Sequence, residues 1–530
     1  MRLSPFRGPL CALLVSLSVG VLAAGCGSSS SGSSGGSGSI SPQSAGASGS
    51  TTTLRVPYLA DMSVPDPDVF YDIEGNSVIL SNYQGLLTYA PNSTRLVGLL
   101  AKTFSESADG LTYTFQLQPN VKFHDGTPFT SRSVAASFHR REAMGATAPA
   151  GYMLHTVKQV LTPKPLTVIV KLKSRTVPFL DYLASAWSPK MIGPAALVTN
   201  KGKDLSQTYL QTHDDGTGPY VLTSFQRGQQ YTLTAYAGYW GSAPSFKTVL
   251  IKIVPAIGTQ QLELKNGNLD MITHSFPASQ LSSLGSNLIA HKYPAFLRAM
   301  LYVNTNKAPF NDPAVRAALA KTINVPQIVS EAYAGTATVP NGPYPPGILA
   351  GQPPLDYGKG PPAPQKGKGG SITLAYTADE SGIQQRVSEI LQSELASMGY
   401  SVVLKQVQLP QVYNYVKSLG SAPDLLLGTN TPDAAQPDPW ARIVWGSTGG
   451  LNFLGYKNPT IDAELNTALS AAPATAQTIY KTVGQQLVAS HELLFLADVK
   501  DTIITSNTLT GGDHVLAYPW QLNYATLKRG

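Results

Sequence analysis

The sequence predicts an α/β protein with two or three domains. Residues 110–134 change from the two-residue period of a strand to a turn and then to the start of a helix. Residues 371–408 show a strand, a helix and a second strand in succession, which is typical of a parallel crossover unit. A chain of 530 residues is also long enough to bury more than one large core.

The first of these stretches begins with a half-buried strand. Its apolar side chains alternate with Thr and Gln, and they are Leu111, Tyr113, Phe115 and Leu117. A turn follows at His124-Asp125-Gly126, because Asp caps a turn and Gly accepts positive φ. We interpret His124 and Asp125 as turn residues and not as a catalytic pair. Thr130 or Ser131 is then placed to cap a helix.

The crossover unit is the clearest element of the second half of the chain. The strands ITLAY and SVVLKQV flank a helix. One face of that helix is apolar, with Ile383, Val387, Ile390, Leu391, Leu395 and Met398. Gly399 stands just after the last of these residues, the position where a glycine ends a helix in left-handed conformation.

Composition and motif spacing exclude several classes of function. Charged residues make up 13% of the chain, about half the usual fraction, and no cluster of Lys and Arg alternates with aromatic residues, so we expect no nucleic-acid partner. The eight histidines show no metal-ligand spacing. No nucleophile stands beside an orienting base, and no phosphate-binding glycine motif occurs. We therefore predict no enzyme activity, no catalytic residue, no cofactor and no metal site.

The N-terminus predicts export and a lipid anchor. Arg2 and Arg7 precede an apolar run, and Ala23-Ala24-Gly25 precedes Cys26, which resembles a bacterial lipoprotein signal cleaved before that cysteine. Both cysteines of the chain lie in this segment, so we expect no disulfide in the mature domain. Residues 27–53 are almost wholly Gly, Ser, Ala and Thr, a composition typical of a tether. We expect two acyl chains at Cys26 to hold the protein at the cell membrane.

Several runs together resemble one family. The run TYTFQLQPNVKFHDGTPFT is followed in order by GTGPY, AGYWGSAP and LGYKNPTIDAEL. The same runs occur in family 5 of the extracytoplasmic solute-binding proteins of bacterial ABC importers, which includes dipeptide-, oligopeptide- and nickel-binding proteins. The chain departs from the family at residues 341–370, where a Pro- and Gly-rich stretch replaces a helix. We expect an irregular loop or a shortened lobe there.

The resemblance implies a two-lobe periplasmic-binding-protein-like fold of the class II type, with an extra small subdomain in the first lobe. The implied divisions are a signal peptide at 1–25, a tether at 26–53, the main domain of lobe I at 54–85, 205–297 and 503–530, the small subdomain of lobe I at 86–204, and lobe II at 298–502.

The candidate ligand site is the run NTPDAAQPDPWARIVW, residues 430–445. In peptide-binding relatives, an aspartate in this run pairs with the terminal ammonium of the ligand. The usual position of that acid is occupied by Ala435, and the nearest carboxylate is Asp433. Either Asp433 takes over the contact, or the contact is lost and Asp433 is a solvated turn residue.

Six further residues are candidates for ligand contacts. Trp440 and Trp187 offer large aromatic faces, for which core packing is the alternative. The other four lie where the family's side chains point into the cleft: Tyr58, Tyr83, Gln84 and Asn304.

The resemblance predicts a monomeric receptor that captures an oligopeptide or dipeptide between its lobes and delivers it to the transmembrane subunits of an ABC permease. The alternatives are the same fold with a non-peptide solute, such as a metal-chelator complex or an oligosaccharide, a secreted hydrolase, and an adhesin that has lost its ligand.

Overall fold

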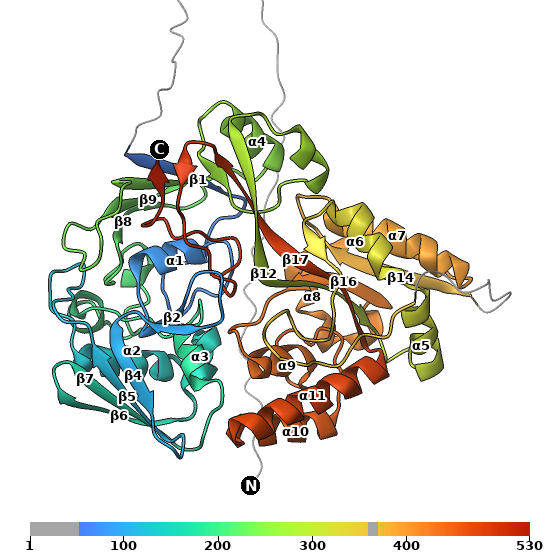
Figure 1. Ribbon diagram of the computed structural model, residues 1–530, viewed down its shortest axis with the longest axis horizontal. Coiled ribbons are helices and arrows are strands. Elements are labelled where there is room, and N and C mark those ends of the chain that lie inside the picture. The colour runs from blue at the N-terminus through green and yellow to red at the C-terminus, as the bar shows by residue number, and fades with distance from the viewer. Residues whose placement is uncertain (1–51, 359–368) are drawn as a thin grey trace, which may run out of the picture. The chain divides into compact units, whose positions relative to one another are not determined.

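The computed structural model describes residues 52–358 and 369–530, and three larger sheets organise them (Figure 1). One four-stranded sheet has the order β1-β10-β9-β8. β1 runs parallel to β10, and the other neighbours are antiparallel. Its strands are β1 (Thr53–Tyr58), β8 (Tyr220–Gln226), β9 (Gln230–Ala235) and β10 (Thr248–Ile253).

The second four-stranded sheet is antiparallel throughout and has the order β4-β5-β7-β6. Its strands are β4 (Ala101–Glu106), β5 (Thr112–Leu117), β6 (Val157–Lys164) and β7 (Thr167–Leu172). β5 buries Tyr113, Phe115 and Leu117 and leaves the residues between them less buried, so the alternation predicted from the sequence is confirmed. β2 (Leu87–Tyr89) and β3 (Leu96–Gly98) form a small hairpin nearby.

The third sheet has seven strands in the order β11-β17-β12-β16-β14-β15, with β13 paired to β17. Its strands are β11 (Met271–Ile272), β12 (Leu288–Val303), β13 (Ala337–Thr338), β14 (Ser371–Thr377), β15 (Ser401–Val407), β16 (Leu425–Asn430) and β17 (Leu493–Ser506). The C-terminus adds a two-stranded ladder of β18 (Leu509–Thr510) and β19 (Lys528–Arg529).

Two long antiparallel strands pass through the middle of the fold. β12 and β17 pair from Leu288 opposite Ser506 to Tyr302 opposite Leu493. The register shifts twice, after the pair of Tyr293 and Asp501 and after the pair of Ala299 and Ala497. We call residues 52–287 and 507–530 the first lobe and residues 304–358 and 369–492 the second lobe, since β12 and β17 connect them (Figure 1). The boundaries predicted at 297/298 and 502/503 fall inside these strands, and the domain boundaries remain a prediction.

Eleven α-helices lie in the described ranges. They are α1 (Asn76–Asn82), α2 (Ser131–Met144), α3 (Phe179–Ala184), α4 (Ile257–Lys265), α5 (Pro313–Thr322), α6 (Val325–Tyr333), α7 (Ile383–Ser397), α8 (Leu409–Val412), α9 (Pro437–Trp445), α10 (Pro459–Ser470) and α11 (Pro473–Ser490). None of these helices in residues 52–358 and 369–530 is long and apolar enough to span a bilayer.

The predicted crossover unit is confirmed. β14 and β15 are parallel neighbours, α7 joins them, and Val387, Leu391 and Leu395 are buried on one face of that helix. Gly399 has φ +89°, the conformation expected of the residue that ends this helix. α2 begins after Thr130, as the sequence predicts.

α1 is a short helix that ends at Asn82. The helix stops at Asn82 because the backbone N–H of Gly218 donates to the Asn82 carbonyl, at 2.9 Å, while Tyr83 is extended. A Cβ atom on Gly216 would lie 1.9 Å from the same carbonyl oxygen, so the GTGPY run needs glycine to approach α1 this closely.

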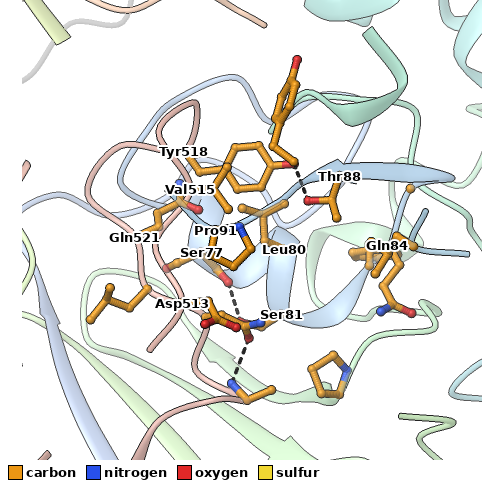
Figure 2. Close-up of a pocket in the computed structure, with 18 of the residues that line it drawn as sticks. Ser77, Leu80, Ser81, Gln84, Thr88, Pro91, Asp513, Val515, Tyr518 and Gln521 are labelled. Carbon is orange, nitrogen blue, oxygen red and sulfur yellow. Dashed lines mark hydrogen bonds between the residues drawn. The ribbon is translucent and has the colours of Figure 1, made fainter. Parts of the chain in front are cut away.

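A cavity of about 250 Å³ lies in the first lobe between α1, β2, β3 and the C-terminal segment 513–525 (Figure 2). Leu80, Thr88 and Tyr518 are among the residues that line it. No residue of the candidate run 430–445 takes part in its lining.

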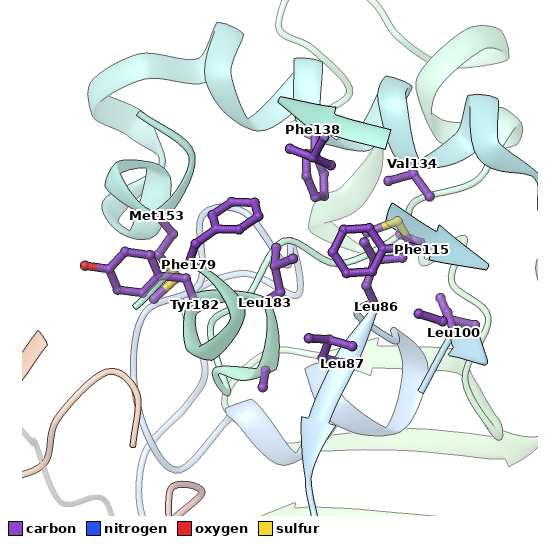
Figure 3. Close-up of a cluster of buried hydrophobic side chains, with 14 of the residues drawn as sticks. Leu86, Leu87, Leu100, Phe115, Val134, Phe138, Met153, Phe179, Tyr182 and Leu183 are labelled. Carbon is purple, nitrogen blue, oxygen red and sulfur yellow. The ribbon is translucent and has the colours of Figure 1, made fainter. Parts of the chain in front are cut away.

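The largest core of the first lobe joins α2 and α3 to the sheet that contains β5 (Figure 3). Phe115 of β5, Phe138 of α2 and Phe179 of α3 are all buried in this cluster. Ala434 and Ala435 belong to the same cluster although they lie in the second lobe. The candidate run is therefore packed directly on the core of the opposite lobe.

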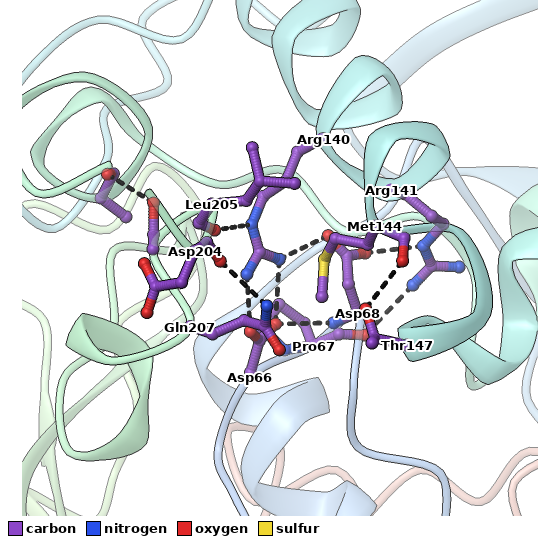
Figure 4. A network of polar contacts seen from close by, with 12 residues as sticks. Asp66, Pro67, Asp68, Arg140, Arg141, Met144, Thr147, Asp204, Leu205 and Gln207 are labelled. Atoms are coloured by element: carbon purple, nitrogen blue, oxygen red, sulfur yellow. Dashed lines mark hydrogen bonds and ion pairs between the residues drawn. The ribbon is translucent and has the colours of Figure 1, made fainter. Parts of the chain in front are cut away.

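A buried network of charges joins α2 to the loop after β1 (Figure 4). The Arg140 guanidinium donates to both carboxylate oxygens of Asp66, at 2.9 and 2.6 Å, and to Asp68 at 2.6 Å. Arg141 donates to Asp68 at 2.6 Å and to the Trp187 carbonyl at 2.7 Å. Because every member is paired, the network can be buried and fixes the start of the loop that carries Tyr71.

We expect Arg140→Met to destabilise the fold, because the substitution leaves the Asp66 carboxylate buried without its counter-charge. Removing one member of a buried ion pair costs about 3 to 5 kcal/mol. Chemical denaturation followed by circular dichroism measures the effect. Arg132 is exposed on the same helix, so Arg132→Met is the matched control and should leave the midpoint unchanged. Equal midpoints for the two variants would contradict the assigned role of the network.

Candidate ligand-binding site

The candidate site is centred on Asp433, which lies in the loop between β16 and α9. The carboxylate accepts hydrogen bonds from the Tyr71 hydroxyl, at 2.7 Å to Oδ1 and 2.8 Å to Oδ2, and from the Tyr152 hydroxyl. Both tyrosines belong to the first lobe, so the carboxylate bridges the two lobes. Only 3% of Asp433 is exposed, which contradicts the alternative that it is a solvated turn residue.

Further contacts between the lobes hold the backbone of this loop. The Ser185 hydroxyl donates to the Asp433 carbonyl at 2.5 Å, and the Ala435 N–H donates to the Tyr89 hydroxyl at 3.0 Å. The Gln436 side chain then accepts from the Asp438 N–H at 2.9 Å and caps α9. The loop is therefore short, capped and fixed at both ends.

The site contains two acidic side chains, those of Asp433 and Asp72. Burial raises the pKa of Asp433, and the hydroxyls of Tyr152 and Tyr71 oppose that shift only in part. Among the described residues, no ion pair joins Asp433 to a Lys, Arg or His side chain. Burial also raises the pKa of Tyr413, and the charges of Asp72 and Asp433 add to the shift, so Tyr413 lies near both carboxylates.

Aromatic side chains surround this carboxylate. The Trp187 ring lies 5.3 Å from the ring of Tyr71, and its Nε1 donates to the Asp72 carbonyl at 3.3 Å. Tyr71 is 43% exposed and Tyr413 is 47% exposed. The structure thus brings two predicted residues, Asp433 and Trp187, into contact with Tyr71.

Trp440 does not join this group. Its side chain is fully buried in the core of the second lobe, and its Nε1 donates to the Pro343 carbonyl at 3.0 Å. Core packing, the alternative to a ligand contact, therefore describes Trp440 in this structure.

The other predicted residues also lie away from Asp433. Tyr58 is buried in β1 with its hydroxyl on Ser77, and the Asn304 side chain donates to the Pro423 carbonyl at 2.9 Å. Tyr83 and Gln84 line the cavity of the first lobe. Gln84 accepts from Trp240 Nε1 at 2.9 Å.

Sequence analysis missed the partners of Asp433, namely Tyr71, Tyr152 and Ser185, and it also missed Tyr89, whose hydroxyl accepts from the Ala435 N–H. Tyr71 lies shortly after the proline-rich turn Val64-Pro65-Asp66-Pro67. That turn is the one local signal in the sequence that could have drawn attention to Tyr71. Tyr152 carries no local signal, because its contact joins residues 281 positions apart. In residues 52–358 and 369–530, no group of three or more His, Cys, Asp and Glu side chains is placed to hold a metal ion. Cys26 lies outside the described residues.

His124 and Asp125 serve the local structure. Asp125 accepts from the Thr127 N–H at 2.8 Å and so forms the predicted turn. His124 Nδ1 lies 2.7 Å from Asp214 Oδ1. Burial disfavours its charged form, but the Asp214 carboxylate outweighs that effect and raises the pKa of His124. This pair links the turn to the GTGPY run.

Comparison with known proteins agrees with this architecture. The chain is 30% identical to the "Probable D,D-dipeptide-binding periplasmic protein DdpA" of Escherichia coli (strain K12) over 447 residues, 81% of this chain and 85% of that protein. It is 28% identical to the glutathione-binding protein GsiB of Pectobacterium atrosepticum over 486 residues, 88% of this chain and 90% of that protein.

Solved structures share the fold. The periplasmic binding protein DppA of Helicobacter pylori, in complex with the peptide STSA, superposes with a TM-score of 0.74 at 21% identity and covers 90% of this chain and 98% of its own. The two-lobe α/β fold predicted from the sequence is confirmed. The model of bacterial extracellular solute-binding proteins, family 5 (middle), matches residues 95–452, more than half of the chain. The chain therefore belongs to family 5 of the bacterial extracellular solute-binding proteins.

Proposed function

We propose that this protein captures a peptide with a free amino terminus between its lobes and delivers it to an ABC permease. The observation that carries the proposal is the Asp433 carboxylate, which is buried at the contact between the lobes and, within the described residues, bonded only by neutral hydroxyls. An ammonium group is the ligand chemistry that suits such a carboxylate, because charge-assisted hydrogen bonds are strongest where water is scarce.

The ligand's own charge would complete the site. A terminal ammonium donates up to three hydrogen bonds, and Asp433 has acceptor capacity beyond the two tyrosine hydroxyls. Three aromatic rings would contact the side chains of the bound peptide next to its ammonium group, through apolar and cation–π contacts. They are the rings of Tyr71, Trp187 and Tyr413. The names of the relatives, which include a dipeptide-binding and a glutathione-binding protein, support a peptide as the solute.

Closure of the lobes would couple binding to delivery. Asp433 belongs to the second lobe and its tyrosine partners to the first, so a ligand held by both favours the arrangement in which they meet. β12 and β17 connect the lobes and are the elements on which such a motion would turn.

The protein would work outside the cytoplasm as a lipid-anchored monomer. The signal segment before Cys26 and the Gly- and Ser-rich residues 27–53 support an anchor and a tether. A tether of this composition lets the receptor reach a permease in the same membrane.

We expect Asp433→Asn to weaken the binding of peptides with a free amino terminus by about 10- to 100-fold, because the amide keeps the shape but loses the charge. The probes are D-alanyl-D-alanine and L-alanyl-L-alanine, measured by calorimetry with free and acetylated amino termini. Glu380→Gln removes an exposed carboxylate of the second lobe and is the matched control. Acetylated probes that bind as tightly as the free ones would contradict the proposal.

The affinity for these dipeptides should fall as the pH is lowered. Burial raises the pKa of Asp433 in the free protein, and an ammonium ligand would lower it again by stabilising the charged form. Affinity is then fully present above the pKa of the free protein, is lost as the pH falls through it, and binding releases protons in that range. Calorimetry from about pH 4 to 7 in buffers of different ionisation enthalpy measures the release. Proton uptake, or a release that persists in Asp433→Asn, would argue against this role.

We expect Cys26→Ala to abolish lipid attachment, because only the thiol at that position can carry the acyl group that retains the protein. Incorporation of labelled palmitate and fractionation of producing cells measure the effect. Cys11→Ala should leave both results unchanged, since that cysteine lies in the segment predicted to be removed. Labelling that survives in Cys26→Ala would disprove the anchor.

A further inference from the structure

The cavity of the first lobe does not include the Asp433 carboxylate or the two tyrosines that donate to it. It is lined by α1, by β2 and β3, and by the C-terminal segment, and its volume is about 250 Å³ (Figure 2). Asp433, Tyr71, Tyr152 and Trp187 are not among its lining residues. A cavity of about 150 Å³ already holds a molecule the size of benzene, so this one accommodates a larger guest.

One polar residue of the lining is a lysine without an anionic partner. Lys190 is 3% exposed, and its Nζ donates to the Ser188 hydroxyl at 2.8 Å and to the Ser185 carbonyl at 3.3 Å. Among the described residues, no carboxylate forms an ion pair with it. An ammonium group has three N–H donors, so one donor remains for a guest.

Burial, with the nearby Arg141 charge, lowers the pKa of Lys190 to about 7. A buried amine with a pKa near 7 is only partly protonated at neutral pH, and an anion that binds beside it favours the protonated, charged form. The lysine is therefore suited to an acidic group more than to a neutral one.

A second polar group in the lining lacks a partner. Gln521 is 5% exposed, and its amide nitrogen donates to the Ile73 carbonyl at 3.1 Å. Its Oε1 is buried and has no hydrogen-bond partner in the part of the chain that the structure describes. Buried acceptors of this kind are normally satisfied, so the cavity has an unmet acceptor in addition to the spare donor of Lys190.

The remaining walls are mostly apolar. They include Leu80, Leu87, Val97, Leu99, Val515 and Leu522. Pro91, Asp513 and Asn523 are exposed members of the lining, which gives the cavity a way to solvent. The lining thus combines a buried cationic group with an apolar chamber that opens to the surface.

We propose that this cavity is a second binding site, which takes a small amphiphilic carboxylate. Its carboxylate would accept the free N–H of Lys190, and its apolar body would lie against Leu80, Leu87 and Val97. The site is distinct from the peptide site, so its occupation does not depend on Asp433.

Titration calorimetry with hexanoate and hexan-1-ol tests the proposal, because the two probes share an apolar body and differ in charge. Hexanoate should bind one to one, at least about tenfold more tightly than the alcohol, and should take up protons near pH 7 as the pKa of Lys190 rises. Saturation with a dipeptide should not displace it. Equal affinity for the two probes, or displacement by the dipeptide, would overturn the assignment.

Two variants locate the site. Lys190→Met keeps the length of the side chain and removes the charge, so it should abolish the preference for hexanoate while dipeptide binding persists. Val97→Phe narrows the cavity from β3 and should weaken both probes. Lys203→Met removes an exposed charge from the same lobe and is the control. Unchanged hexanoate binding in Lys190→Met and Val97→Phe would show that the cavity is not the site. Asp433 is not part of this cavity, so Asp433→Asn should bind hexanoate as the unsubstituted protein does, whatever the effect of the substitution on dipeptide binding.

Discussion

The buried pairing of Asp66 and Asp68 with Arg140 and Arg141 is the constraint on which the site depends. Four charges without bulk water are tolerable only when each is paired, and here the pairing also engages the Trp187 carbonyl. The network joins three segments far apart in sequence: the loop after β1, the end of α2 and the turn before residue 190. Tyr71 and Trp187 extend from two of those segments, so their contact is set by the network beneath them.

The strands between the lobes carry a second buried polar group. Asp501 lies on β17 opposite Tyr293, where the first register shift of the ladder begins. Its carboxylate accepts from His514 Nε2 at 2.9 Å and from the Trp520 N–H at 2.5 Å. The Tyr293 ring stacks on His514 with centroids 4.5 Å apart. The C-terminal segment is thereby attached to the crossing strands at the point where their ladder is irregular. A bend concentrated there would move the second lobe without disturbing either four-stranded sheet of the first.

Helices and strands whose limits are set by residues close in sequence could be predicted from local sequence patterns. The stripe from Ile383 to Leu395 and the glycine at 399 specify α7 through neighbours within a few residues. α1 could not be delimited in this way, because the Gly218 N–H that ends it comes from more than a hundred residues away. The same limit applies to the site. Asp433 was singled out through a family motif, whereas Tyr71 and Tyr152 reach it only through tertiary packing. Residue type alone could not decide between a cleft wall and core packing for Trp440, because an aromatic ring suits both places.

A purely structural role for Asp433 explains its chemistry poorly. Two tyrosine hydroxyls and the loop contacts of Ser185 and Tyr89 would hold an asparagine at the same position without the cost of burying a charge. A carboxylate with a raised pKa and no cationic neighbour in the described chain destabilises the free protein at neutral pH. Such a cost is typical of binding sites, where the missing charge arrives with the ligand. Asp68 and Asp438 differ from Asp433 in this respect. Both are buried, and each forms an ion pair with an arginine of the same chain.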